Sequence, residues 1–192
     1  MKSKLLSAFV LVLALLPMTA SAGLKNNFES TYDNDLDDVY TDAIPEYHVV
    51  NDGLIRGGRP QKGDLAALKK QGVKTIINID EVNSSAERAE AIKLGLNFIA
   101  SPMSSFKSPK DSQVNKILAQ LQDPALMPIF IHCKHGQDRT GMIMGLYRFH
   151  VNNWSSRKAY AEMNEYGFHP ILKGLDSYFK KRTGYKRTTN NF

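Results

Sequence analysis

The sequence predicts an α/β fold in which a mostly parallel central sheet is flanked by helices on both faces. Between residues 47 and 181, short runs of β-branched and apolar residues alternate with segments of helical periodicity. The run at residues 129–132 is almost entirely apolar, as expected of a strand buried on both faces. Strands that alternate with helices form parallel sheets, because each helix returns the chain to the same edge.

The first half of this region predicts a hairpin, a helix and a strand. Residues 47–50 and 54–56 predict a β-hairpin on the turn Asn51-Asp52-Gly53. Residues 61–71 predict a helix with Leu65 and Leu68 facing inward and Gly72 at its end. Residues 73–79 predict the strand that follows.

A second helix and strand complete this half. Residues 84–87, Ser-Ser-Ala-Glu, match a capping box, which opens a helix to Lys93. Residues 96–100 predict the next strand, and residues 102–108 a loop. A further helix is expected to start with Ser108 as its N-cap and Pro109 at its first position.

The second half contains one strand and three helices. The strand is expected at residues 129–132, and the helices at residues 140–152, 155–166 and 170–181. Ser155 is placed to open the second of these helices and Gly167 to close it. We expect the basic tail, residues 180–187, to fray.

The first 22 residues predict a secretory signal peptide. Lys2 and Lys4 precede an apolar stretch at residues 5–16, and Ala20-Ser21-Ala22 supplies a small-residue cleavage pattern. The stretch is shorter than the ~20 residues that span a bilayer, although a retained anchor is the alternative. We therefore expect cleavage after Ala22, a periplasmic or secreted protein, and no membrane insertion of the mature chain. The remaining 170 residues suffice for one hydrophobic core.

Charge divides the mature chain into an acidic leader, residues 23–46, and a domain, residues 47–192. The leader holds one lysine against seven acidic residues, a net charge of −6, which leaves +10 on the domain. The leader is either a solvated segment or packs on the basic domain. A basic domain favours anionic partners. Nucleic acid is not predicted, because basic and aromatic residues are not interleaved. The sequence leaves the oligomeric state open.

The stretch HCKHGQDRTG, residues 132–141, holds Cys133, the only cysteine of the chain. An exported cysteine without a partner in its own chain is buried and inert, paired between chains, or reactive. Residues 133–139, here named the cysteine loop, join the predicted strand to a helix. A helix N-terminus binds anions and lowers the pKa of a thiol, and Arg139 offers a planar fork for two phosphate oxygens. His132, Cys133 and His135 could also form a metal site. This alternative is disfavoured because side chains alternate between the two faces at the end of a strand, which separates these three.

This stretch resembles the signature loop of the protein tyrosine phosphatase superfamily. It is most similar to the dual-specificity branch, which includes exported bacterial members and tyrosine-phosphatase-like phytases. GLIRGGRP resembles the opening hairpin of the family, and YRFHVNNWSSRKAYAEMNEYGF resembles its later helices. The resemblance thus covers most of residues 47–180 and implies the fold of that family.

The resemblance also implies a mechanism without metal or cofactor. Cys133 would attack phosphorus and form a cysteinyl-phosphate, while Arg139 and the N–H groups of residues 134–139 would stabilise the transition state. Thr140 would hydrogen-bond the sulfur and help it to leave. His132 would orient the loop and the thiolate.

The family usually takes the proton for the leaving alcohol from an aspartate in the loop after the preceding strand. In this chain the corresponding stretch, SPMSSFKSP, has Ser105 and Phe106 at those places. Asp138 inside the cysteine loop is the first substitute, since an aspartate there has been proposed as the acid in phosphoinositide phosphatases of the myotubularin and Sac type. The other possibilities are Asp80, Asp111 and no dedicated acid.

Several residues are expected to bind the phosphate groups of the substrate. Lys134, His135 and Lys107 add positive charge, while Arg56 and Arg59 lie either at the rim or on the solvated surface. The expected phosphate-binding set is Lys134, His135, Gly136, Gln137, Asp138, Arg139 and Lys107. Gln137 replaces a lysine common in the lipid phosphatases, so the site is only moderately basic.

The sequence favours inositol polyphosphates, chiefly inositol hexakisphosphate, as the substrate. An exported enzyme would meet these compounds as a source of phosphate. The first alternative is a periplasmic phosphatase that acts on phosphotyrosine in proteins. The second is a pseudophosphatase that binds phosphorylated ligands without turnover.

Overall fold

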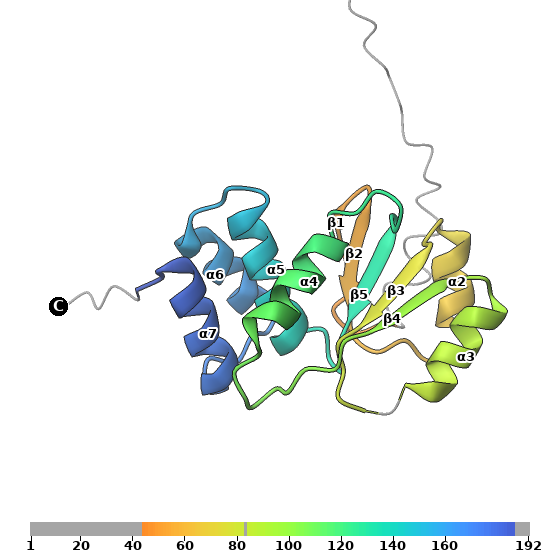
Figure 1. Ribbon diagram of the computed structural model, residues 1–192, viewed down its shortest axis with the longest axis horizontal. Helices are drawn as coiled ribbons and strands as arrows, with labels where there is room; N and C mark the ends of the chain where they lie inside the picture. Colours follow the sequence, from red (N-terminus) through yellow and green to blue (C-terminus); the bar gives the residue numbers. More distant parts are fainter. Residues whose placement is uncertain (1–43, 83, 187–192) are drawn as a thin grey trace, which may run out of the picture. The chain divides into compact units, whose positions relative to one another are not determined.

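The computed structural model describes residues 44–82 and 84–186. They form a five-stranded sheet in the order β1-β2-β5-β3-β4 (Figure 1). The strands are β1 His48–Asn51, β2 Leu54–Gly57, β3 Thr75–Asn78, β4 Asn97–Ala100 and β5 Ile129–His132. β1 and β2 pair in an antiparallel hairpin, and the other three pairings are parallel, which confirms the predicted sheet.

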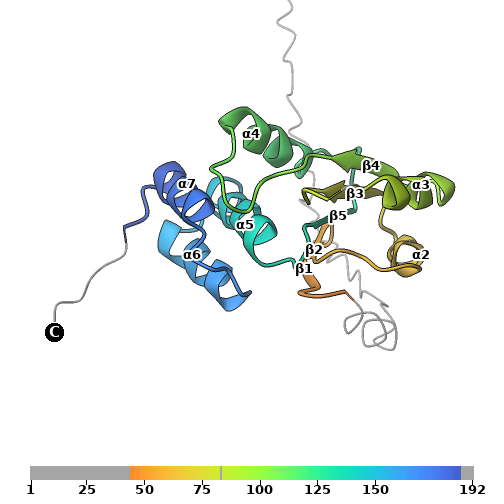
Figure 2. The same ribbon diagram turned by 90° about the horizontal axis from the view of Figure 1, so that it is seen from below.

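Helices cover both faces of this sheet. α2 and α3 lie on one face, while α4, α5, α6 and α7 lie on the other, as the two perpendicular views show (Figure 2). Their bounds are α2 Asp64–Lys70, α3 Ser85–Lys93, α4 Asp111–Gln120, α5 Asp138–His150, α6 Ser156–Glu165 and α7 Lys173–Thr183. The predicted α/β class with helices on both faces is confirmed.

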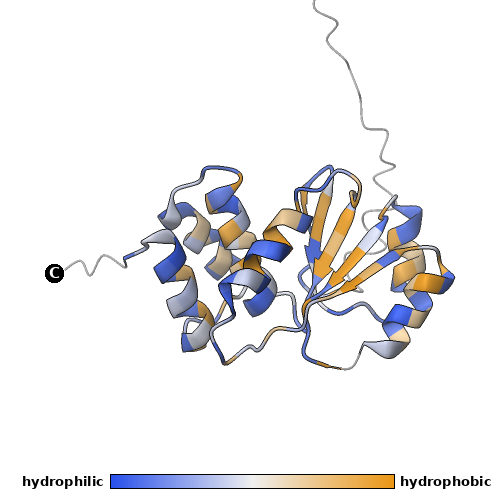
Figure 3. Ribbon diagram, viewed as in Figure 1, coloured by the Kyte–Doolittle hydropathy of each residue, from blue (hydrophilic) through white to orange (hydrophobic). Residues whose placement is uncertain are grey.

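Alternate residues of the inner strands β2, β3 and β5 pack into different cores. In β5, Ile129 and Ile131 belong to the core shared with α4–α7, whereas Phe130 belongs to the core shared with α2 and α3. All three are fully buried. A fully buried aliphatic or aromatic side chain of this size contributes about 1.5–3 kcal/mol. Figure 3 shows the strands as the most continuously apolar part of the described chain.

Several helix ends follow the sequence prediction. Gly72 has φ +91° after α2 and Gly167 has φ +75° after α6, the left-handed geometry expected of helix C-termini. The side chain of Ser155 accepts a hydrogen bond from the backbone N–H of Lys158 at 3.2 Å, so the cap of α6 is confirmed.

Of the other two predicted N-caps, one is confirmed only in its position and one is wrong. Ser84 is the N-cap residue of α3, but its side chain makes no cap bond, and the Glu87 carboxylate binds residues of β3 and β5 rather than completing the capping box. α4 begins at Asp111 after Lys110, not after Ser108. The segment before it packs closely on the start of α7, since a Cβ on Gly174 would lie 2.8 Å from the backbone nitrogen of Ser108.

The ends of the chain extend beyond the described residues. The predicted signal peptide and residues 23–43 of the leader lie outside them. The last leader residues pack on the domain, where Ile44 is buried and the carbonyl of Pro45 accepts from the N–H of Gly58 at 2.6 Å. In the tail, residues 180–183 are still helical. Within the described chain, no helix combines the length and apolar character needed to cross a membrane.

Candidate active site

The cysteine loop lies at the carboxyl edge of the parallel strands. It leaves β5 after His132, which is paired with Gly57 of β2 and with Asn78 of β3. The loop leads into α5, whose first residue is Asp138. Asp80, two residues after β3, is therefore at the same edge. Crevices outside the carboxyl ends of parallel strands are the usual place for ligands in open α/β sheets.

The course of the loop depends on Gly136. This residue has φ +80°, and a Cβ on it would lie 2.8 Å from the backbone carbon of Gly57 and the nitrogen of Gly58. The backbone N–H of Arg59 also donates to the carbonyl of Lys134 at 3.1 Å. The segment after β2 thus fixes the curvature of the loop.

Arg56 lies beneath the loop rather than at its rim. Its side chain is 1% exposed, and its Nη2 donates to the carbonyl of Gly136 at 2.5 Å. Its guanidinium lies 4.8 Å from the ring centroid of Tyr166. Burial lowers the pKa of Arg56, while the charges of Glu162 and Cys133, among others, act in the opposite direction. Both placements that the sequence suggested, rim or solvated surface, are wrong, because Tyr166 and the loop cover this side chain.

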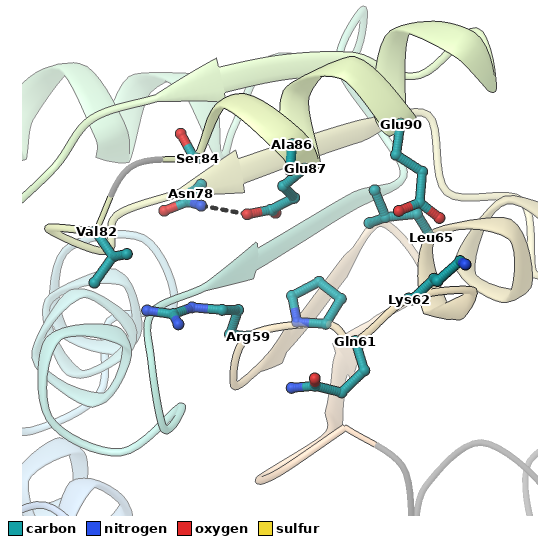
Figure 4. A pocket seen from close by; sticks show the side chains of 11 residues that line it. Arg59, Gln61, Lys62, Leu65, Asn78, Val82, Ser84, Ala86, Glu87 and Glu90 are labelled. Atoms are coloured by element: carbon teal, nitrogen blue, oxygen red, sulfur yellow. Dashed lines mark hydrogen bonds between the residues drawn. The ribbon is translucent and has the colours of Figure 1, made fainter.

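Cys133 is 2% exposed and follows a histidine that is held on both sides. The Nδ1 atom of His132 lies 3.2 Å from the carbonyl oxygen of Cys133, and its Nε2 lies 2.7 Å from Oε1 of Glu87. The other oxygen of Glu87 accepts from Nδ2 of Asn78 at 2.6 Å (Figure 4). The histidine next to the thiol is thus oriented by a carboxylate of α3.

A cavity of about 420 Å³ opens on the far side of this carboxylate. In Figure 4, Glu87 and Asn78 point toward each other in this cavity, and Arg59 extends from the opposite wall. Among the described residues, no cluster of three histidine, cysteine, aspartate or glutamate side chains is arranged to hold a metal ion.

Arg139, at the other end of the loop, is held from behind by Asp80. Its Nη1 donates to Oδ1 of Asp80 at 3.1 Å and to the carbonyl of Met103 at 3.3 Å. Arg59 also donates from Nε to Oδ2 of Asp80 at 2.9 Å. Burial alone would raise the pKa of Asp80, but the hydrogen bond from Arg59 and the charge of Arg139 outweigh it, so this pKa is lowered. Asp80 is therefore unsuited to donate a proton and instead fixes Arg139.

The loop also presents unpaired hydrogen-bonding groups. Within the described chain, the backbone N–H groups of residues 134–137 donate to no protein acceptor. The Nε of Arg139 and the hydroxyl of Thr140 are buried and have no partner there. The predicted hydrogen bond from Thr140 to the sulfur of Cys133 is therefore not formed in this structure. Groups that can donate to one oxyanion thus remain free along the loop.

A cavity of about 430 Å³, here named the loop cavity, opens beside these groups. It is lined by Ser105, Phe106, Lys134, His135, Asp138, Arg139, His169, Ile171 and Leu172. Phe106 and Ile171 are 76% and 79% exposed, so its rim is partly apolar. Lys107 is not among the lining residues, and the side chain of Gln137 donates to Oε1 of Glu46 at 3.2 Å instead. Four of the expected phosphate-binding residues do meet here, namely Lys134, His135, Asp138 and Arg139.

Asp138 faces the loop cavity and is paired with a histidine. Its Oδ1 accepts from the backbone N–H of His169 at 2.9 Å and lies 3.0 Å from Nδ1 of the same residue. Asp111 accepts from the hydroxyl of Tyr178 at 2.9 Å and does not line this cavity. Of the three carboxylates considered for proton donation, only Asp138 lines the loop cavity.

Sequence reasoning missed three residues of this site. Glu87 was assigned to a capping box, Arg56 to the surface or rim, and His169 to no role. Each contacts the loop or the histidine that precedes it across a long sequence separation, which no local pattern encodes. Only the burial of Arg56 had a local signal. This arginine lies within a short strand, β2, whose other residues are uncharged and buried.

Comparisons with known proteins agree with this geometry. Residues 26–173 match the family described as DSP-PTPase phosphatase fused to NAD+ Kinase. The dual specificity protein phosphatase TpbA of Pseudomonas aeruginosa is 30% identical over 116 residues, which are 60% of this chain and 51% of the relative. The inositol diphosphatase SIW14 of Saccharomyces cerevisiae is 29% identical over 138 residues, 69% of this chain and 48% of the relative.

The fold is shared with solved structures. A crystal structure of P. aeruginosa TpbA matches with a TM-score of 0.61 at 25% identity, covering 71% of this chain and 84% of that one. The chain spans about half the length of the curated relatives named above.

Proposed function

Because this chain belongs to the dual-specificity branch of the protein tyrosine phosphatase superfamily, we propose that it hydrolyses phosphate monoesters through a cysteinyl-phosphate on Cys133. The observation that carries this proposal is the position of Cys133 and Arg139 at the two ends of one loop, which leads from β5 into the N-terminus of α5. The N–H groups between them are unpaired, and Asp80 holds Arg139 from behind. These groups match a phosphoryl group, which requires several convergent donors.

The chemistry proceeds in two displacements. The Sγ thiolate of Cys133 attacks phosphorus, and the bond to the leaving oxygen breaks. Arg139 and the loop N–H groups stabilise the equatorial oxygens of the transition state. Water then attacks the phosphocysteine and releases phosphate and the thiolate. Thr140 would donate to the departing sulfur, because its buried hydroxyl has no other described partner. The proposed chemistry uses no metal or cofactor.

The loop cavity favours a substrate with one phosphate on an apolar or aromatic group, such as phosphotyrosine. Its charged side chains are Lys134, Arg139 and Asp138, a net charge of +1 with the histidines neutral. Phe106 and Ile171 offer apolar surface at the rim, which suits an aromatic ring. We therefore rank phosphotyrosine ahead of inositol hexakisphosphate, which the sequence favoured.

Inositol polyphosphates are the second candidate. Lys134 and His135 add to the charge of Arg139 within one cavity, an arrangement that suits neighbouring phosphates. The resemblance to the inositol diphosphatase SIW14 covers 69% of this chain and supports the same substrate class.

One assay separates the candidates. The protein is incubated with phosphotyrosine peptides and with inositol hexakisphosphate, with and without chelator, beside Cys133→Ser. We expect phosphate release chiefly from the peptides, none from the variant and no effect of chelator. Preferential release from the inositol compound would replace the first candidate by the second. Binding of both compounds without release would identify a pseudophosphatase, and inhibition by chelator would contradict the proposed chemistry.

We also propose that the protein acts after export, with cleavage after Ala22. The family match begins at residue 26, beyond the proposed cleavage site. Mass spectrometry of the protein from periplasm and culture medium should find a mature chain that starts at Gly23. An intact N-terminus in the cytoplasmic fraction alone would contradict the proposal.

A further inference from the structure

Asp138 and His169 form a pair at the wall of the loop cavity. One oxygen of Asp138 accepts from the backbone N–H of His169 at 2.9 Å and lies 3.0 Å from its ring Nδ1. The Asp138 side chain is 15% exposed and that of His169 58%. The two side chains are 31 positions apart, so the pair forms only in the fold.

The contacts of Asp138 are those of an orienting group. Its Oδ1 already accepts from the N–H of His169, and the ring Nδ1 lies within hydrogen-bond distance of the same atom. A carboxylate that accepts from Nδ1 fixes both the tautomer and the direction of the imidazole, and leaves Nε2 for another partner. The solvent-exposed end of this pair is therefore the imidazole of His169.

Other proton donors near the phosphate site are less suited. Ser105 occupies the place of the usual aspartate, and the lowered pKa of Asp80 keeps it ionised. Asp111 lies outside the cavity. His135 does line the cavity, but no described residue forms a hydrogen bond with its ring, so nothing orients it.

We propose that His169, oriented by Asp138, is the general acid of the phosphatase reaction. This inference rests on the proposed function and deepens it. As Sγ of Cys133 bonds to phosphorus, the electron pair of the breaking P–O bond passes to the leaving oxygen. That oxygen takes the proton from Nε2 of the His169 imidazolium. The products are the free alcohol, a neutral imidazole and the cysteinyl-phosphate.

The same imidazole acts as the base of the second step. As the oxygen of water bonds to phosphorus, Nε2 accepts its proton and the S–P electron pair returns to Cys133. Inorganic phosphate, the thiolate and the imidazolium result, so the enzyme is restored. Histidine suits both roles because its ordinary charge change falls between pH 5 and 8.

The test compares phosphate esters whose leaving alcohols differ in acidity. 4-Nitrophenyl phosphate releases an acidic phenol and needs little protonation, whereas phenyl phosphate and alkyl phosphates need more. In His169→Asn we expect kcat/KM for 4-nitrophenyl phosphate to fall less than about fivefold and that for phenyl phosphate to fall roughly 10²-fold. The substitution keeps the N–H that donates to Asp138, because this group belongs to the backbone.

His150→Asn is the matched control, since His150 is the last residue of α5 and lies about 18 Å along the helix from Asp138. It should leave the dependence on the leaving group unchanged. His169→Gln repeats the test, and urea unfolding of each variant identifies any loss of fold. If folded His169→Asn and His169→Gln show the same dependence of kcat/KM on the leaving alcohol as the wild type, this inference is overturned.

Two further variants identify the competing donors. If kcat/KM depends steeply on the acidity of the leaving alcohol in Asp138→Asn but not in His169→Asn, the acid is Asp138. If this steep dependence occurs only in His135→Asn, the acid is His135. Either result overturns our inference while the proposed function stands. Failure of the wild type to exceed Cys133→Ser on any ester would overturn the proposed function and this inference together.

Discussion

The Nη2 atom of Arg56 donates a hydrogen bond of 2.5 Å to the carbonyl oxygen of Gly136, 80 positions later in the chain. This bond joins the buried strand β2 to the middle of the cysteine loop. Arg56 is charged and almost fully buried, and burial lowers its pKa. The fold therefore keeps a costly charge under the loop that carries the nucleophile.

Replacement of Arg56 should separate activity from stability. In Arg56→Met, relief of the buried charge offsets the lost hydrogen bond, so the free energy of unfolding should change by less than about 1 kcal/mol. The loop loses its support and its nearby positive charge, and kcat/KM should fall roughly 10–100-fold. Urea unfolding and steady-state kinetics check both, and Arg56→Lys should recover part of the activity. A fall in kcat/KM that is accompanied by a comparable loss of unfolding free energy would show that Arg56 has only a structural role.

Removal of the Glu87 carboxylate should disturb His132. In Glu87→Ala, the fully buried Nε2 of His132 loses its partner, which costs about 1–3 kcal/mol of unfolding free energy. The kcat should fall as well, because His132 also contacts the backbone of Cys133. Glu87→Gln keeps an acceptor and should recover most of the loss. Glu90→Ala, on the same helix, is the control and should stay within about 0.5 kcal/mol of wild type.

The loop should not tolerate a side chain at position 136. Gly136→Ala combines a positive φ with a clash against the backbone of Gly57 and Gly58. A displacement of about 1 Å in the loop would lower kcat/KM roughly 10²-fold. Gly63→Ala is the matched control, since Gly63 also has a positive φ, +95°, but open space around it. It should cost about 1–2 kcal/mol in urea unfolding and leave kcat/KM unchanged.

Asp80 should make stability depend on acid pH. Its pKa is below the ordinary 3.8 in the folded state, so the ionised carboxylate stabilises the fold. This contribution is complete above about pH 4 and is lost as the pH falls through the lower folded pKa. Asp80→Asn should cost about 1.5–3 kcal/mol at neutral pH. Urea midpoints measured at about pH 5 and about pH 3 should therefore fall more in the wild type than in Asp80→Asn; parallel falls would contradict the assignment.

The apolar rim should contribute to substrate affinity. Contact of Phe106 with an aromatic ring that buries roughly 40 Å² is worth about 1 kcal/mol, so Phe106→Ala should raise KM for a phosphotyrosine peptide roughly fivefold. The kcat should change little, because an apolar contact made equally in the bound substrate and in the transition state affects KM alone. Ile92→Ala removes another exposed apolar side chain, 63% exposed on α3, and should leave KM unchanged. An equal rise of KM for inositol hexakisphosphate would argue against an aromatic contact.

Local patterns were sufficient for the strands, the helices and the cysteine loop. The Asp-Gly turn, the glycines after α2 and α6 and the serine cap of α6 depend on neighbouring residues alone. The loop was recognisable because its chemistry requires a cysteine, a glycine and an arginine at fixed spacing within one segment.

The roles of Glu87, Asp80 and His169 depend on tertiary contacts, which local sequence patterns do not encode. Glu87 fits a capping box by its spacing, but the buried His132 offers a stronger partner, so the cap is not formed. Asp80 was a candidate for the general acid in the sequence. In the fold, Arg59 and Arg139 donate hydrogen bonds to its two carboxylate oxygens. His169 carries no motif, and only the return of the chain between α6 and α7 brings it to Asp138.

The 2% exposure of Cys133 has a consequence for chemical tools directed at this protein. A bulky electrophile has little access to the sulfur, and the cavity beside the loop carries Lys134 and Arg139. A covalent probe should therefore be small and anionic, so that the cations that would hold the phosphate also deliver the reactive carbon. Selectivity over exposed surface thiols would then come from the small size and negative charge of the reactive group itself, without an attached recognition group.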